Sequence, residues 1–137
     1  MSIVKSEIEL EELLSRISEK KLKIVFTNGC FDILHPGHIH VLEKSKSFGD
    51  ILIVGLNSDS SIKNLKGASR PKVKEGDRMK IISSIKYVDH VILFEEDTPL
   101  TLIKKIKPHI LVKGGAYSLN NIAVSYTHLT LPTTPYV

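Results

Sequence analysis

Short apolar runs alternate with segments of helical character along most of this 137-residue chain, and this alternation limits the possible folds. The runs typical of buried strands are residues 23–26, 51–56, 88–94 and 110–112. Helices are predicted at 6–21, 37–48, from the polar turn 57–59 to about residue 65, at 77–85, and from Thr98-Pro99 until just before Pro108. Strands that alternate with helices form βαβ units, so we expect an α/β fold with a parallel sheet covered on both faces.

The size and charge of the chain exclude several classes of function. A chain of 137 residues fits one domain, and a net charge of +4 suits a small anionic ligand without requiring nucleic acid. The apolar runs are too short to span a membrane, and the charged N-terminus does not resemble a signal peptide. The single cysteine, Cys30, fits a reducing compartment. We therefore expect a cytoplasmic domain that binds neither nucleic acid nor membrane.

The most informative motif is His35-Pro36-Gly37-His38, which follows the first long apolar run and the turn-like Thr27-Asn28-Gly29. Its two imidazoles lie one helical turn apart, at the point where a strand gives way to a helix. Histidine donates hydrogen bonds to phosphate oxygens, and a helix N-terminus attracts anions. The motif therefore predicts a phosphate-handling site beyond the carboxyl ends of the strands.

Two aspartates and a glycine pair also follow predicted strands. Asp32 and Asp59 are typical of turns and helix caps, although Asp32 could orient a histidine or help to hold a metal. Lys113-Gly114-Gly115 is either a tight turn or backbone that a nucleotide approaches closely. Cys30 is expected to be a packed thiol, because no base is assigned to it.

The phrase from Thr27 to His38 resembles the signature of the HxGH nucleotidylyltransferases, whose fold is Rossmann-like. More narrowly, the chain resembles the adenylyltransferase domain that forms ADP-heptose from D-glycero-β-D-manno-heptose 1-phosphate. Six separated segments carry this resemblance: 26–32, 54–59, 65–67 with 70–71, 87–89, 94–99 and 111–115.

The resemblance implies that a sugar phosphate attacks the α-phosphate of ATP and that pyrophosphate leaves. It assigns catalysis to His35, His38 and Lys66. The residues that it implies for nucleotide binding are Asn28, Gly29, Cys30, Phe31, Asp32, His35, Gly37, His38, Asp59, Arg78, Lys113, Gly114 and Gly115. Magnesium would arrive with ATP, and we predict no residue as its direct ligand. The densest basic stretch consists of Lys63, Lys66, Arg70, Lys72, Lys74 and Arg78. Lys66 and Arg78 are the phosphate contacts that the resemblance favours, and the other side chains are expected to form a solvated face.

We divide the chain into an N-terminal helix (1–22), a nucleotidylyltransferase domain (23–122) and an irregular tail (123–137). Ala116 stands where the family usually has aspartate, and the tail lacks the expected Ser/Thr-rich helix start. C-terminal elements of the fold therefore look missing or replaced.

Two alternatives to the adenylyltransferase hypothesis stay open. One is a cytidylyltransferase acting on glycerol 3-phosphate or a similar polyol phosphate, and the other is an inactive nucleotide-binding module with an altered C-terminus. We expect a stand-alone transferase, and an exposed apolar stripe on the 6–21 helix could support a homodimer.

Overall fold

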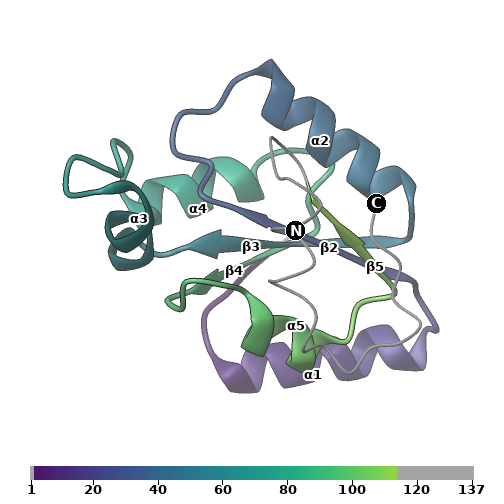
Figure 1. Ribbon diagram of the computed structural model, residues 1–137. Helices are drawn as coiled ribbons and strands as arrows, with labels where there is room; N and C mark the ends of the chain where they lie inside the picture. The colour runs from purple at the N-terminus through teal and green to yellow at the C-terminus, as the bar shows by residue number, and fades with distance from the viewer. Residues whose placement is uncertain (1, 114–137) are drawn as a thin grey trace.

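The computed structural model of the chain describes residues 2–113, in which strands and helices alternate (Figure 1). In chain order the elements are β1 (Ser2–Val4), α1 (Glu7–Glu19), β2 (Ile24–Gly29), α2 (Pro36–Ser47), β3 (Ile51–Asn57), α3 (Asp59–Lys66), α4 (Glu75–Ser83), β4 (His90–Phe94), α5 (Leu100–Ile106) and β5 (Ile110–Val112). This confirms the predicted Rossmann-like α/β fold. Predicted C-terminal features, including the tail 123–137, lie outside the described residues.

The strands form one parallel sheet in the order β1-β4-β3-β2-β5. The chain passes from β2 through β3 to β4 on one side and returns with β5 to the other side of β2. The strand order therefore reverses between β2 and β5. Ligands of open α/β sheets bind beyond the carboxyl ends of the strands at such a reversal. The fold thus marks the end of β2 as a place to look for a site.

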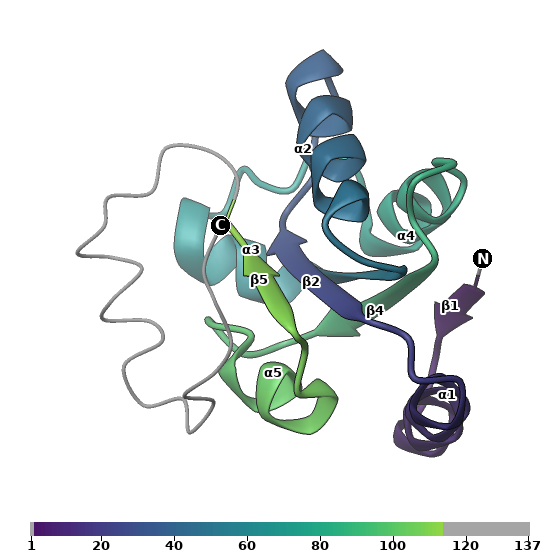
Figure 2. The same ribbon diagram turned by 90° about the vertical axis from the view of Figure 1, so that its right-hand side faces the viewer.

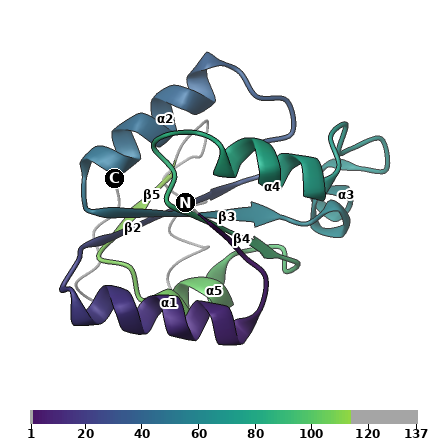
Figure 3. The ribbon, with the colours of Figure 1, turned by 180° about the vertical axis from the view of Figure 1, so that it is seen from behind.

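Helices cover both faces of the sheet, with α2 and α4 on one face and α1 and α5 on the other (Figures 1 and 3). Alternation along the strands divides the core between these faces. Val25 and Val54 pack in the cluster that includes Leu42 of α2, whereas Phe26 and Ile53 pack in the cluster that includes Leu10, Leu13 and Ile17 of α1. Both faces are therefore buried, as the continuous apolar strands predict.

Ser6 and Glu9 cap the start of α1. Ser6 Oγ accepts a hydrogen bond from the Glu9 N–H (3.1 Å), which satisfies one of the free N–H groups of the first turn. The Glu9 carboxylate accepts from the N–H of Lys5 (2.7 Å), the residue before the N-cap. Each helix among residues 2–113 is too short or too polar to span a lipid bilayer.

The end of β2 and the presence of β1 differ from the sequence-based expectation. The residues expected to form a turn, Thr27 to Gly29, extend β2, because they pair with Val54 to Leu56 of β3. β1 was not predicted, and it joins the sheet by pairing with β4 some 88 residues away (Ser2 with His90). At three residues β1 is too short to give a recognisable alternation of its own.

Candidate active site

A cavity of about 550 Å³ lies where β2 gives way to α2. Many of the residues predicted to act on the nucleotide line it: Asn28, Gly29, Cys30, Phe31, Asp32, His35, Gly37, His38 and Lys66. Residues outside the predicted site also line it: Thr27, Ile33, Val41 and Arg70. Figure 2 shows α2 above β2, with the edge strand β5 beside β2. The cavity is therefore at the reversal of strand order.

The two histidines of the motif cap the first turn of α2 reciprocally. The Gly37 N–H donates to His35 Nδ1 (3.0 Å), and the His35 N–H donates to His38 Nδ1 (3.1 Å). A ring nitrogen that accepts a hydrogen bond carries no proton, so each neutral imidazole carries its proton on Nε2. The ring centroids are 4.0 Å apart. The arrangement thus offers two adjacent Nε2–H donors at a helix N-terminus.

The environment of His38 favours its neutral form. Burial, the neighbouring His35 ring and the Lys66 ammonium group together lower the pKa of His38 from its ordinary value. A proton on Nδ1 would also break the hydrogen bond from the His35 N–H. At neutral pH His38 is therefore an uncharged donor, and Lys66 and Arg70, which line the same cavity, contribute positive charge.

Phe31 explains the glycine that ends β2. A Cβ at Gly29 would lie 2.9 Å from Phe31 Cε2, so the absence of a side chain at residue 29 admits the phenyl ring. The ring lies against His38, with centroids 5.4 Å apart. Phe31 itself has a positive φ of 47°. Gly29 thus makes room for the Phe31 side chain, and it also lines the cavity.

Arg78 lies inside the protein, and the structure assigns it a different role from the expected phosphate contact. Its side chain is fully buried and donates to the carbonyl oxygens of Cys30, Asn57 and Val73, at 2.9, 2.7 and 2.8 Å. A further N–H group bonds Asp59 Oδ1 at 2.7 Å. Neither Arg78 nor Asp59 is among the residues that line the cavity. We therefore revise Arg78 to a buried support of the loops around the site.

Lys113 connects the end of β5 to the cavity wall. Its Nζ donates to Asn28 Oδ1 (3.0 Å), and burial lowers the pKa of Lys113 to about 8. Thr27 strengthens the same junction by donating to the Val112 carbonyl oxygen (2.9 Å). The predicted site residues Gly114 and Gly115, like Ala116, lie outside the described residues.

Cys30 is a half-buried thiol in the cavity wall. Burial raises the pKa of Cys30, although the positive charges of Lys66 and Arg78 oppose this effect. The thiol form therefore dominates at neutral pH, which fits the expected packing role.

Asp32 is the only carboxylate among the described residues that line the cavity. Asp32 Oδ2 accepts a hydrogen bond from the Arg70 Nε–H at 2.7 Å. Orientation of a histidine, one of the roles that the sequence allows for Asp32, is therefore not its role in the structure. Within residues 2–113 no group of three or more His, Cys, Asp or Glu side chains is placed to hold a metal ion.

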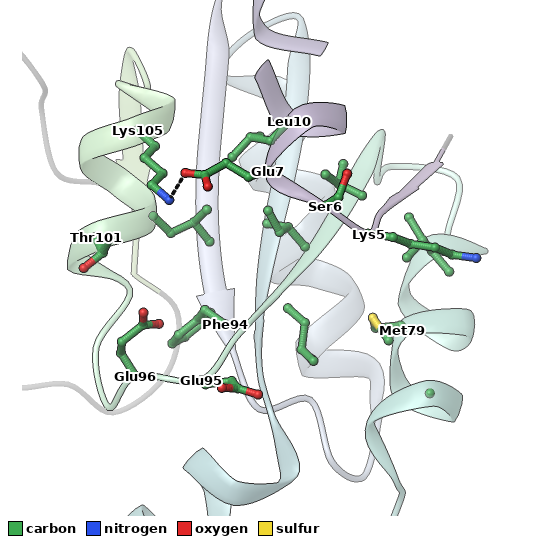
Figure 4. A pocket seen from close by; sticks show the side chains of 16 residues that line it. Lys5, Ser6, Glu7, Leu10, Met79, Phe94, Glu95, Glu96, Thr101 and Lys105 are labelled. Atoms are coloured by element: carbon green, nitrogen blue, oxygen red, sulfur yellow. Dashed lines mark hydrogen bonds and ion pairs between the residues drawn. The ribbon is translucent and has the colours of Figure 1, made fainter. Parts of the chain in front are cut away.

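A second, larger cavity of about 700 Å³ lies between α1, α5 and the end of β4 (Figure 4). An ion pair between Glu7 and Lys105 crosses it, and Phe94 and Leu10 contribute apolar surface. Among the described residues that line this cavity, none is a histidine or belongs to the predicted site. Chemistry and not volume therefore identifies the smaller cavity as the candidate site.

The chain is similar to a known protein family and to curated relatives of that family. Residues 26–132 match the family model described as cytidylyltransferase-like, a range that includes most of the stretch 123–137. The chain is 56% identical over 116 residues to the bifunctional protein HldE of Aliarcobacter butzleri, covering 85% of this chain and 24% of that protein. It is 58% identical over 110 residues to HldE of Helicobacter pylori strain Shi470, covering 80% of this chain and 24% of that protein.

A solved structure shares the architecture. The lipopolysaccharide core biosynthesis protein from Thermoplasma volcanium superposes with a TM-score of 0.72 and 32% identity, over 85% of this chain and 94% of that chain. In contrast, the chain spans about a quarter of the length of the curated relatives that it matches.

Proposed function

Because the chain belongs to the cytidylyltransferase-like family, we propose that it transfers AMP from ATP to heptose 1-phosphate, giving ADP-heptose and releasing pyrophosphate. The high identity to HldE proteins supports an adenylyltransferase, and the solved relative named for lipopolysaccharide core biosynthesis supports a sugar-phosphate acceptor. The geometry that carries the proposal is the reciprocal cap of His35 and His38, which leaves both Nε2–H groups to donate into one cavity.

The proposed reaction is an in-line displacement at phosphorus. An oxygen of the acceptor phosphate forms a bond to the α-phosphorus, and the bond from that phosphorus to the β-bridging oxygen breaks. The acceptor phosphate is already ionised at neutral pH, so the attack needs no general base. The protein must therefore position two anions and stabilise the charge that develops between them.

Three side chains meet these needs in the proposal. His35 and His38 donate from Nε2 to phosphate oxygens, and Lys66 contributes a cation at the same cavity. Since both Nδ1 atoms are held by backbone N–H groups, the rings are oriented before the nucleotide binds. Donors that need no reorganisation are the most effective kind in phosphoryl transfer.

Magnesium enters this proposal as part of the nucleotide substrate. Asp32, the carboxylate among the described residues that line the cavity, already accepts hydrogen bonds from Arg70, Lys72 and Val73. The described residues therefore do not fit a resident metal site, and magnesium would be held chiefly by phosphate oxygens and water.

The test measures pyrophosphate release from purified protein with magnesium and either ATP or CTP, each paired with heptose 1-phosphate or glycerol 3-phosphate. The proposal expects turnover with ATP and heptose 1-phosphate. Turnover with CTP and glycerol 3-phosphate alone would favour the alternative that the family description suggests. Nucleotide binding in calorimetry without pyrophosphate from any pair would favour an inactive binding module.

A further inference from the structure

The segment between α3 and α4, residues 67–74, is held by a buried carboxylate. Asp32 is only 5% exposed, and its oxygens accept hydrogen bonds from three residues of this segment. It accepts from Arg70 Nε at 2.7 Å, from the Lys72 N–H at 2.8 Å and from the Val73 N–H at 2.7 Å. A carboxylate with three such donors fixes the path of the segment.

Arg78 holds the same segment from its other side. The carbonyl oxygen of Val73 accepts from Arg78 Nε (2.8 Å), and Arg78 also binds the carbonyl oxygen of Cys30 (2.9 Å). The Val73 N–H therefore bonds Asp32, which belongs to the loop 30–32. The Val73 carbonyl oxygen bonds Arg78, which in turn binds the same loop at Cys30. The segment 67–74 and the loop after β2 therefore form one unit.

This anchoring determines how Arg70 meets the cavity. Its Nε–H bonds Asp32 Oδ2, which sets the orientation of the guanidinium plane. The Arg70 side chain is 33% exposed and lines the cavity together with Lys66 and the two histidines. The two terminal nitrogens of a guanidinium carry four more N–H groups, arranged to grip a phosphate through parallel hydrogen bonds.

We propose that Asp32 is a positioning residue, which orients Arg70 so that the terminal N–H groups of Arg70 bind a phosphate group of the substrates. This inference rests on the proposed function and adds a residue pair to it. The phosphate could belong to the nucleotide or to the acceptor, and the experiment below distinguishes the two sources. Asp32 itself touches neither substrate.

The ionisation of Asp32 suits this role across the whole range of practical assays. Burial alone would raise its pKa, but the Lys72 and Val73 N–H groups and Arg70 together lower the pKa of Asp32 to about 2. The Asp32 carboxylate therefore stays charged at neutral and at mildly acidic pH.

The test compares Asp32→Asn, Arg70→Ala and the double variant, with Lys74→Ala as the matched control. Lys74 lies in the same basic segment, is exposed and does not line the cavity. We expect Arg70→Ala to raise KM for one substrate about 10- to 100-fold, the size of a lost charge-assisted pair. Asp32→Asn should raise KM for the same substrate at least several-fold, and Lys74→Ala should leave it unchanged.

The double variant separates positioning from general stability. If Asp32 acts through Arg70, adding Asp32→Asn to Arg70→Ala should change that KM little further. A KM increase from Asp32→Asn that is equally large in both backgrounds would overturn the proposal. So would unchanged KM values for both substrates accompanied only by a lower melting temperature.

Further variants and binding measurements keep the test decisive. If Asp32→Asn does not fold, Arg70→Lys takes its place in the test. This variant retains the positive charge but loses the planar guanidinium, so a KM equal to that of the unchanged protein would overturn the proposal. Calorimetry with ATP and with the acceptor phosphate identifies which ligand Arg70 binds. If the unchanged protein binds these ligands but releases no pyrophosphate, the proposed function fails. If Arg70→Ala and Lys74→Ala bind both ligands with equal affinity, the role of Arg70 is refuted and the proposed function is not.

Discussion

At the scale of single residues, the site uses each histidine twice. Nδ1 of His35 and Nδ1 of His38 accept backbone N–H groups and so complete the start of α2. Nε2 of each ring then remains for a substrate. Serine or aspartate at the N-cap would satisfy the helix equally well but would offer no second, oppositely directed donor. The choice of histidine at both cap positions therefore combines a structural and a chemical requirement.

Substitution of His35 should separate these two functions. Asparagine is a good N-cap residue, so His35→Asn should retain stability yet lower kcat by about 100-fold, because the Nε2–H donor is lost. His35→Ala should lose the same activity and also about 1 kcal/mol of unfolding free energy. Pyrophosphate release and urea unfolding measure the two effects. Full activity in a folded His35→Asn variant would contradict the catalytic assignment.

The lowered pKa of His38 predicts a pH dependence of stability with a definite sign. Below about pH 6.5 the unfolded chain takes up a proton at His38 that the folded protein resists, so stability falls as the pH falls. Glutamine at the N3 position can accept the same backbone hydrogen bond without titrating. His38→Gln should therefore flatten the decline in unfolding free energy between pH 7 and pH 5.

His90 is the internal control for this measurement. Its pKa is also lowered, mainly by burial, so it contributes to the decline with the same sign in both proteins. The difference between the unchanged protein and His38→Gln removes that shared contribution. Parallel curves for the two proteins would contradict the assignment to His38.

At the scale of elements, the sequence predicted most of what positions the site. The apolar runs locate the central strands, and the predicted helix 37–48 agrees with α2 (Pro36–Ser47) to within one residue at each end. The extension of β2 through Asn28 and Gly29 was missed, because these residues are typical of turns until a neighbouring strand supplies their partners. Pairing between distant segments is the information that local patterns lack.

Gly37 is the element-scale feature most open to experiment. A Cβ at this position would lie 2.7 Å from His35 Cε1 and 3.0 Å from His35 Nδ1, so the His35 ring must move. Gly37→Ala should therefore disturb the reciprocal cap and lower kcat by up to about 100-fold, the effect of losing one donor. The measurement is pyrophosphate release at saturating substrates, with circular dichroism to verify folding.

Gly76 provides the matched control on another helix. It lies in the first turn of α4, and a Cβ there would meet nothing within 4 Å. Gly76→Ala should leave kcat unchanged and raise stability by about 0.4–1 kcal/mol, because it restricts the unfolded chain. Equal activities for the two alanine variants would show that the space beside His35 is not critical.

At the scale of the whole molecule, burial decides between side chains that look alike in sequence. Arg70 and Arg78 belong to one basic stretch, and the sequence favoured Arg78 as a phosphate contact. The fold buries Arg78 completely between the ends of β2 and β3 and leaves Arg70 at the cavity. The charge of a side chain is known from the sequence, but its burial depends on which strands become neighbours in the folded protein. That dependence explains why the motif was predictable and its supporting residues were not.

Arg78 should therefore contribute to the stability of the whole molecule. Arg78→Met retains much of the side-chain volume but leaves Asp59 and the carbonyl oxygens of Cys30, Asn57 and Val73 without their donor. Breaking a buried charge network in this way costs about 3–5 kcal/mol of unfolding free energy. Lys105→Met, which breaks the exposed ion pair with Glu7, should leave urea unfolding nearly unchanged. If the two variants unfold at the same urea concentration, Arg78 does not hold the loops together, and its expected role as a phosphate ligand would regain support.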